Sequence, residues 1–138
     1  MSLDDPRPSA ELGEAIVASG HLAPLVARGH VSRWLDGRAD ADVRANACLL
    51  VSELVTNSVR HADQPPGAPV RITAAASDGH VRVDVQDQGH GPVRRRVPDS
   101  DEGGFGLNLV DMIAARWGVD DERGTRVWFE LATAHSPA

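Results

Sequence analysis

Hydrophobic residues recur with helical spacing in two segments of the first half of the chain. The first segment covers residues 24–35 and begins with Pro24, which suits a first helical position. Its apolar face would hold Ala27, Val31, Trp34 and Leu35. The second segment runs from about Asp40, an acceptable N-cap, to about Ala62, where the stretch DQPPGAP stops it. The pattern therefore predicts a short helix followed by a longer one.

The spacing then changes to the alternation that is typical of strands. Residues 81–87 alternate cleanly, with Val81, Val83 and Val85 on one face and polar residues on the other, and residues 70–76 alternate weakly. The stretch SDGH between them is typical of a turn, so the two strands predict a hairpin.

The last part of the chain adds a helix and two strands. Helical spacing resumes from about residue 106 to 117, with an apolar side made of Leu107, Val110, Ile113, Ala114 and Trp117. The stretch WGVDDERGTRVWFEL predicts two strands around a turn at DERG. Residues 88–103 show no periodicity and form an unusually long loop.

This order of elements predicts an α/β fold. Two helices, a hairpin, a loop, a helix and a second hairpin favour a two-layer α/β sandwich, with a mixed, mostly antiparallel sheet and helices on one face. Residues 1–20 leave a strand and a helical turn open as alternatives, and residues 133–138 are expected to form a frayed tail.

Composition and charge limit the classes of function. The chain has 138 residues, 41% of them hydrophobic and 25% charged, as expected of one globular domain. Its net charge of −6 argues against nucleic acid or an anionic membrane as a direct partner. The single cysteine, Cys48, suits a reducing compartment, and its place in the helical pattern favours a buried thiol over a nucleophile. We therefore expect a cytoplasmic protein. We expect no zinc site, because no cluster of residues has the spacing of zinc ligands.

The stretch SELVTNSVRHA, residues 52–62, carries a polar stripe beside an apolar face. Glu53, Asn57 and Arg60 recur at helical spacing outside the face formed by Leu50, Val51, Leu54, Val55 and Ala62. The carbonyl oxygen of Asn57 is a hard ligand suited to Mg²⁺. The Glu53 carboxylate suits a general base. A solvated helix face remains the alternative.

Two glycine-rich stretches offer further chemistry. In DQGHG, Asp87 ends a strand before Gly89 and Gly91, and its carboxylate is able to accept a hydrogen bond from an exocyclic amine; a turn with a capping aspartate is the alternative. In GGFGL, Gly103, Gly104 and Gly106 precede a helix whose first amides suit phosphate oxygens; a flexible helix start is the alternative. GGFGL has the context of neither a Walker nor a Rossmann motif.

Together and in this order, these stretches resemble the GHKL (Bergerat-fold) ATPase and kinase superfamily. More narrowly, the chain resembles the small single-domain anti-sigma-factor serine/threonine kinases of bacteria and their ATP-binding relatives. ELVTNSVRHA is similar to the N box, DQGHG and GGFGL to the two glycine boxes, and GTRVWFEL to the last strands. The resemblance covers roughly residues 24–131, and it implies a histidine-kinase-like ATP-binding domain over residues 21–132.

The resemblance implies roles for matching residues. Glu53 would be the general base, Asn57 would bind Mg²⁺, and Asp87 would contact adenine. The remaining matches would shape the adenine pocket and the phosphate site; they are Gly89, Gly91, Gly104, Gly106, Leu107 and Thr125.

The implied function is an ATP-dependent switch. The protein would hold a sigma factor and phosphorylate a serine or threonine of an anti-anti-sigma partner, and a homodimer is left open. The alternative is a non-catalytic module that binds ATP and sequesters a partner. A sensor histidine kinase is disfavoured because no phosphoacceptor helix pair precedes the domain. A gyrase-like or chaperone ATPase is disfavoured because it requires additional domains.

Overall fold

The computed structural model of the chain describes residues 10–61, 65–89, 107–120 and 124–133. The elements are β1 (Ala10–Ala18), α1 (Ala23–Leu35), α2 (Ala41–His61), β2 (Pro69–Ser77), β3 (His80–Asp87), α3 (Leu107–Ile113), β4 (Arg116–Asp120) and β5 (Thr125–Ala132). Helices and strands thus follow the predicted order, with one further strand at the beginning.

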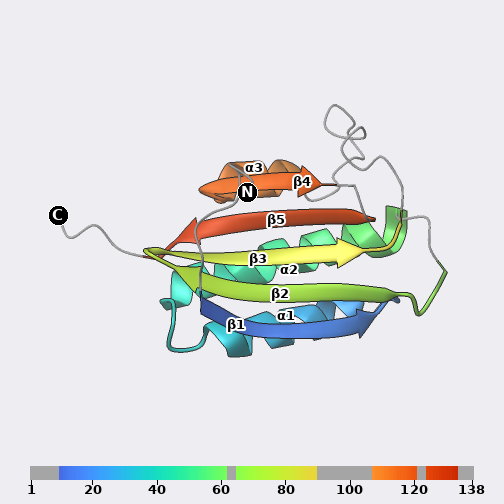
Figure 1. The fold of residues 1–138 in the computed structure, drawn as a ribbon, viewed down its shortest axis with the longest axis horizontal. Helices are drawn as coiled ribbons and strands as arrows, with labels where there is room; N and C mark the ends of the chain where they lie inside the picture. The colour runs from blue at the N-terminus through green and yellow to red at the C-terminus, as the bar shows by residue number, and fades with distance from the viewer. Residues whose placement is uncertain (1–9, 62–64, 90–106, 121–123, 134–138) are drawn as a thin grey trace.

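The strands form one sheet and the helices cover one side of it (Figure 1). The sheet has five strands in the order β1-β2-β3-β5-β4, and each neighbouring pair is antiparallel. The predicted hairpin is confirmed as β2 and β3, joined by a turn in which Gly79 has φ 75°. The two-layer α/β sandwich is therefore confirmed. Among the described residues, no helix is long and apolar enough to cross a membrane.

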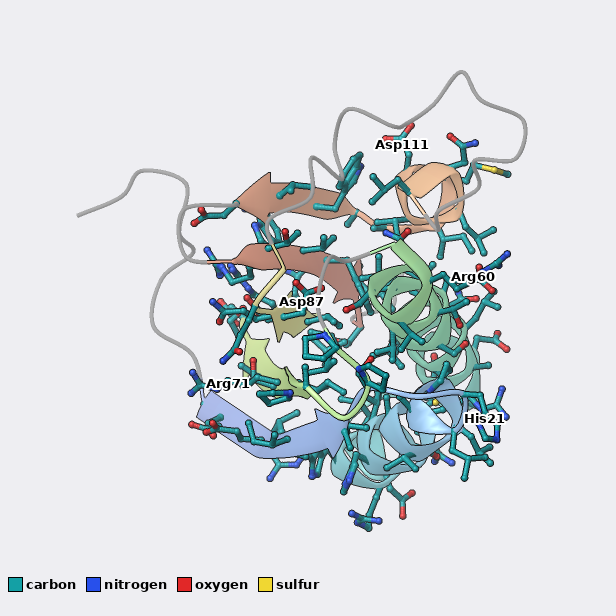
Figure 2. All side chains as sticks on the ribbon, turned by 90° about the vertical axis from the view of Figure 1, so that its right-hand side faces the viewer. His21, Arg60, Arg71, Asp87 and Asp111 are labelled. Atoms are coloured by element: carbon teal, nitrogen blue, oxygen red, sulfur yellow. The ribbon has the colours of Figure 1, made fainter. Side chains whose placement is uncertain are left out.

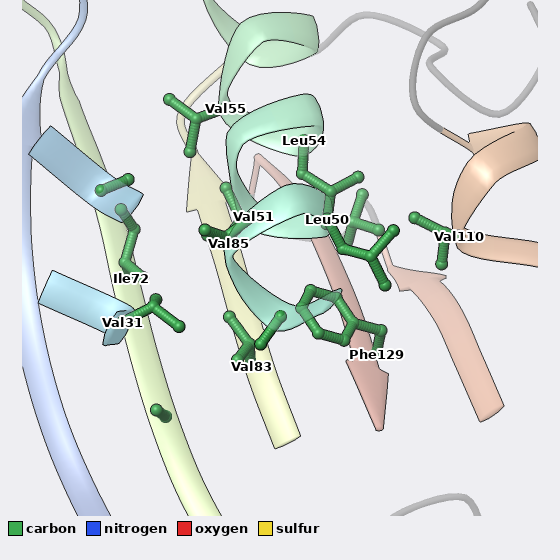
Figure 3. Close-up of a cluster of buried hydrophobic side chains, with 14 of the residues drawn as sticks. Val31, Leu50, Val51, Leu54, Val55, Ile72, Val83, Val85, Val110 and Phe129 are labelled. Atoms are coloured by element: carbon green, nitrogen blue, oxygen red, sulfur yellow. The ribbon is translucent and has the colours of Figure 1, made fainter. Parts of the chain in front are cut away.

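The core lies between the two layers (Figure 3). Leu50, Val51, Leu54 and Val55 of α2 are buried, as their spacing predicts. They meet the valines that alternate along β3 and the aromatic ring of Phe129 from β5, which is completely buried. The apolar face of α2 is therefore fixed against the centre of the sheet, and the polar residues beside it are carried to the edge of that contact.

The first strand resolves the ambiguity for residues 10–18, whereas residues 1–9 lie outside the described residues. β1 pairs with β2 from Ala10↔Ala76 to Ala18↔Pro69. Gly13 lies under the indole of Trp34 from α1, so close that a Cβ on Gly13 would stand 2.2 Å from the ring. The segment is a strand because β2 offers it a partner and Trp34 covers its inner face, and neither partner is local in sequence.

The predicted helix from residue 106 to 117 was wrong at its C-terminal end. α3 ends at Ile113, and Trp117 belongs to β4, where it pairs with Phe129. Trp117 also donates a hydrogen bond from its indole to Asp111 Oδ1, at 2.9 Å. Apolar residues at positions 113, 114 and 117 fit both helical spacing and a helix followed by a strand. The pairing of Trp117 with Phe129 of β5 places Trp117 in a strand.

The other face of the sheet carries a cluster of charged residues on β3 and β5. Arg82 and Arg126 both donate to the carboxylate of Asp84, at 3.0 and 2.7 Å. The Arg82 guanidinium also lies over the Trp128 ring, 4.2 Å from its centroid. These contacts match the predicted alternation of β3, with one apolar and one polar face.

We expect Phe129→Ala to be among the most damaging core substitutions. It removes a completely buried ring at the centre of the contact between the layers, which should lower the free energy of unfolding by about 3–5 kcal/mol. Urea denaturation measures this. Met112→Ala, at an exposed position of α3, is the control and should change stability by less than about 0.5 kcal/mol. Equal effects of the two substitutions would contradict this account of the core.

Candidate functional site

The second half of α2 meets the ends of two strands. β3 ends at Asp87, which is paired across the sheet with Thr125 at the start of β5. Figure 2 shows Asp87 between the sheet and the helices, whereas Arg60 points away from the sheet. The fold therefore brings the beginning of DQGHG, the middle of the N-box-like stretch and the start of the last strand to one place.

Asp87 is a buried carboxylate held at both oxygens. Asp87 is only 5% exposed. Ser58 of α2 donates a hydrogen bond from Oγ to Oδ2, at 2.5 Å. The backbone N–H of Gly89 donates to Oδ1, at 2.8 Å. Because a buried charged group needs hydrogen-bond partners, these two donors explain how the carboxylate is accommodated inside the protein.

The backbone around Asp87 is fixed by the start of β5. Thr125 donates from Oγ1 to the carbonyl oxygen of Gly89, at 3.2 Å. Gly124 has φ 84°, and a Cβ there would stand 2.2 Å from the carbonyl oxygen of Asp87. Only glycine therefore allows β5 to begin so close to the end of β3.

Asn57 provides a buried oxygen without a partner. The residue is 5% exposed, and its Oδ1 has no hydrogen-bond partner among the described residues. Such a group is costly in a native structure and calls for an explanation. An amide oxygen is a hard ligand of the type that Mg²⁺ prefers, so Asn57 fits the metal role that its sequence motif suggests.

The other two residues of the polar stripe differ in their exposure to solvent. Glu53, one turn before Asn57, is half-buried, and Arg60, about one turn after Asn57, is exposed. Within the described part of the chain, Glu53 makes no hydrogen bond and no ion pair. Its carboxylate is thus not engaged by any residue that the structure describes.

The glycine-rich stretches are described only in part. Gly89 is buried and takes part in the site through both its N–H and its carbonyl group. Leu107, the first residue of α3, is 4% exposed and belongs to the core cluster. Gly91, Gly104 and Gly106 lie outside the described residues, as does the loop from His90 to Gly103.

Two residues of the site were missed by the sequence reasoning. Ser58 follows Asn57 directly and lay unnoticed inside the N-box-like stretch. Gly124 stands just before Thr125 and was assigned only to a turn. The available signal for Gly124 was a glycine at the start of a strand, which often marks a close approach of backbones. Ser58 carried no comparable signal, because serine is common on helices.

Cys48 lies apart from this site. It is half-buried on α2, and its Sγ donates to the carbonyl oxygen of Arg28, at 3.7 Å. Burial raises the pKa of the Cys48 thiol, and a hydrogen bond with Ser32 and the charges of Arg28 and Arg44 oppose that change only in part. A raised pKa disfavours the reactive thiolate, in agreement with a structural cysteine.

The chain matches the histidine kinase-like ATPase domain family over residues 19–131, and it belongs to that family. Two curated relatives give this class more detail. One is an uncharacterized protein of Streptomyces coelicolor, 39% identical over 84 residues that cover 55% of this chain and 73% of the relative. The other is the anti-sigma F factor of Clostridium acetobutylicum, 28% identical over 85 residues that cover 55% of this chain and 59% of the relative.

We expect Gly124→Ala to disturb the site more than its backbone conformation alone predicts. The new Cβ would collide with the carbonyl group of Asp87, so β5 and the end of β3 would have to separate. Gly67→Ala is a matched control, because Gly67 has nearly the same φ, 85°, with nothing within 4 Å.

Thermal or urea denaturation compares the two variants. The left-handed conformation should cost each of them about 1 kcal/mol, and Gly124→Ala should lose at least about 1 kcal/mol more. A Gly124→Ala variant as stable as Gly67→Ala would show that the two strands tolerate separation at this point.

Proposed function

We propose that the protein binds ATP with Mg²⁺ and acts as an anti-sigma factor with serine/threonine kinase activity. The observation that carries the proposal is the pair of buried oxygen acceptors at one place, the Asp87 carboxylate and the Asn57 amide oxygen. Membership of the histidine kinase-like ATPase domain family supports it.

Asp87 would recognise the adenine ring. Its carboxylate is buried and accepts hydrogen bonds, as an exocyclic amine requires of its partner. Gly89 and Thr125 hold the backbone beside it, so the base would meet a rigid wall rather than a loose loop. Gly91, Gly104 and Gly106 belong to the proposed site by their sequence motifs alone.

Asn57 would hold the magnesium ion. When bound beside ATP, Mg²⁺ neutralises part of the phosphate charge and so favours transfer of the terminal phosphate. Asn57 would supply one oxygen ligand from the protein, from a helix whose apolar face is locked in the core. Because α2 is held rigidly by the core, the Asn57 oxygen would not need to move to bind the metal ion.

Glu53 would be the general base. It is half-buried one turn from Asn57, and no described contact engages its carboxylate. In the transfer, Glu53 would accept the proton of the attacking serine or threonine hydroxyl. The oxygen would form a bond to the terminal phosphorus of ATP, and the bond from that phosphorus to the bridging oxygen would break, leaving ADP.

The partners would be a sigma factor and an anti-anti-sigma protein of the cytoplasm. Support comes from the anti-sigma F factor of Clostridium acetobutylicum, of which the matched region covers 59%. The alternative is an ATP-binding module that sequesters its partner without transferring phosphate. The half-buried, uncommitted Glu53 favours the kinase, because a purely binding module does not require a base.

We expect Asn57→Ala to abolish the dependence of ATP binding on Mg²⁺ while leaving the fold intact. Among the described residues the lost oxygen has no hydrogen bond to give up, so stability should change little beyond the effect of a small cavity. Calorimetry with ATP, with and without Mg²⁺, measures the first effect, and thermal denaturation measures the second.

Asn46→Ala, at a half-buried position about three turns before Asn57 on the same helix, is the control. It should keep the wild-type response to Mg²⁺. An Asn57→Ala variant that still gains ATP affinity from Mg²⁺ would remove Asn57 from the metal site.

We expect Glu53→Gln to stop phosphate transfer while ATP binding continues. The substitution keeps the shape of the side chain and removes its basicity, which should slow transfer by about 100-fold or more. The assay combines ATP labelled at its terminal phosphate with candidate anti-anti-sigma proteins, and calorimetry measures ATP affinity in parallel.

The same assay separates the two proposed functions. Transfer by the wild type that Glu53→Gln removes supports the kinase. A wild type that binds ATP but labels none of the candidates favours the sequestering module. Equal transfer by wild type and variant would assign the base to another residue.

A further inference from the structure

Ser58 makes a hydrogen bond that its position on a helix does not explain. Helical serines and threonines commonly bond to a carbonyl group of their own helix. Two neighbours do so: Ser52 donates to the carbonyl of Leu49 and Thr56 to that of Ser52, at 3.0 and 2.7 Å. Ser58 instead donates across the layers to Asp87, 29 positions later in the chain.

This contact is buried on both sides. Ser58 is 6% exposed and Asp87 is 5% exposed, so water does not compete strongly for either group. A hydrogen bond to a charged group in such surroundings is stronger than one between neutral groups at the surface. Ser58 therefore does more than fill space between α2 and β3.

The bond belongs to a chain of contacts that joins three elements. Ser58 of α2 holds Oδ2 of Asp87, the Gly89 amide holds Oδ1, and Thr125 of β5 holds the Gly89 carbonyl. A carboxylate held at both oxygens from different directions cannot rotate freely about its bond to Cβ.

We infer that Ser58 is a positioning residue for purine selection: it fixes the Asp87 carboxylate as an acceptor aimed at an amino group. The inference rests on the proposed binding of ATP. Adenine carries an amine at position 6 and guanine a carbonyl oxygen there. A fixed acceptor would favour the first and oppose the second, whereas a rotating one would discriminate less.

Ser58→Ala tests the inference. The variant removes the donor and leaves Asp87 in place, so its ATP affinity should fall by about tenfold, the effect of losing one hydrogen bond to a charged group. Its affinity for inorganic tripolyphosphate with Mg²⁺ should stay within about twofold of wild type, because that ligand carries no amine. Its affinity for GTP should not fall, because a carboxylate that is able to rotate opposes the guanine carbonyl oxygen less. Calorimetry or competition measures all three ligands.

Two further variants make the result specific. Ser52→Ala removes a serine hydroxyl from the same helix. Among the described residues this hydroxyl donates to the carbonyl group of Leu49 in its own helix, so the variant should bind all three ligands like the wild type. Ser58→Cys keeps nearly the same shape but donates weakly, so it should repeat the selective loss of ATP affinity even where Ser58→Ala fails to fold.

The possible outcomes distinguish failure of this inference from failure of the proposed ATP binding on which it rests. A wild type that binds no ATP overturns the proposed function and this inference with it. A wild type that binds ATP, with Ser58 variants that bind it equally well, overturns the inference alone. Parallel losses of ATP and tripolyphosphate affinity would make Ser58 a merely structural residue, and would also overturn it.

Discussion

The accommodation of one buried carboxylate governs the architecture of the candidate site. Asp87 ends a central strand and points into the layer contact, where an unpaired charged group would be expensive. Three elements meet that requirement: α2 supplies a hydroxyl, the backbone after β3 supplies an N–H, and β5 braces that backbone. The same contacts that make burial tolerable also make the carboxylate rigid.

The helix α2 connects this site to the stability of the whole domain. Its apolar side is buried against β3 and β5, and the residues next to that side are Asn57 and Ser58. Packing of the core thus sets the depth and direction of the polar residues. A helix held in this way would present a metal ligand and a positioning hydroxyl without reorganising when a ligand arrives, which reduces the cost of binding.

The proposed chemistry divides between buried and half-buried residues. Recognition of the base would depend on Asp87 and Ser58, which are shielded from water and fixed. The proposed base, Glu53, is half-buried, and there it would meet the hydroxyl of a protein partner. Such a division is expected of a protein that holds a small ligand inside and acts on a macromolecule outside.

Local patterns in the sequence were sufficient for most of the fold. Helical spacing located α1 and α2 to within a residue or two, and alternation located β2 and β3, because apolar periodicity follows from the geometry of each element and from having one buried face. The motif around Asn57 and Asp87 was likewise readable, because it lies within two short stretches.

Tertiary structure decided what those patterns left open. β1 is a strand only because β2 and Trp34 receive it, and α3 ends early only because Trp117 pairs with Phe129. The contact of Ser58 with Asp87 and the close approach of Gly124 likewise join residues that are distant in sequence. Such contacts depend on how the layers pack and not on local spacing. Periodicity and motifs in the sequence therefore predict most of the elements and the candidate residues. The packing of α2 on β3 and β5 determines how those residues are held.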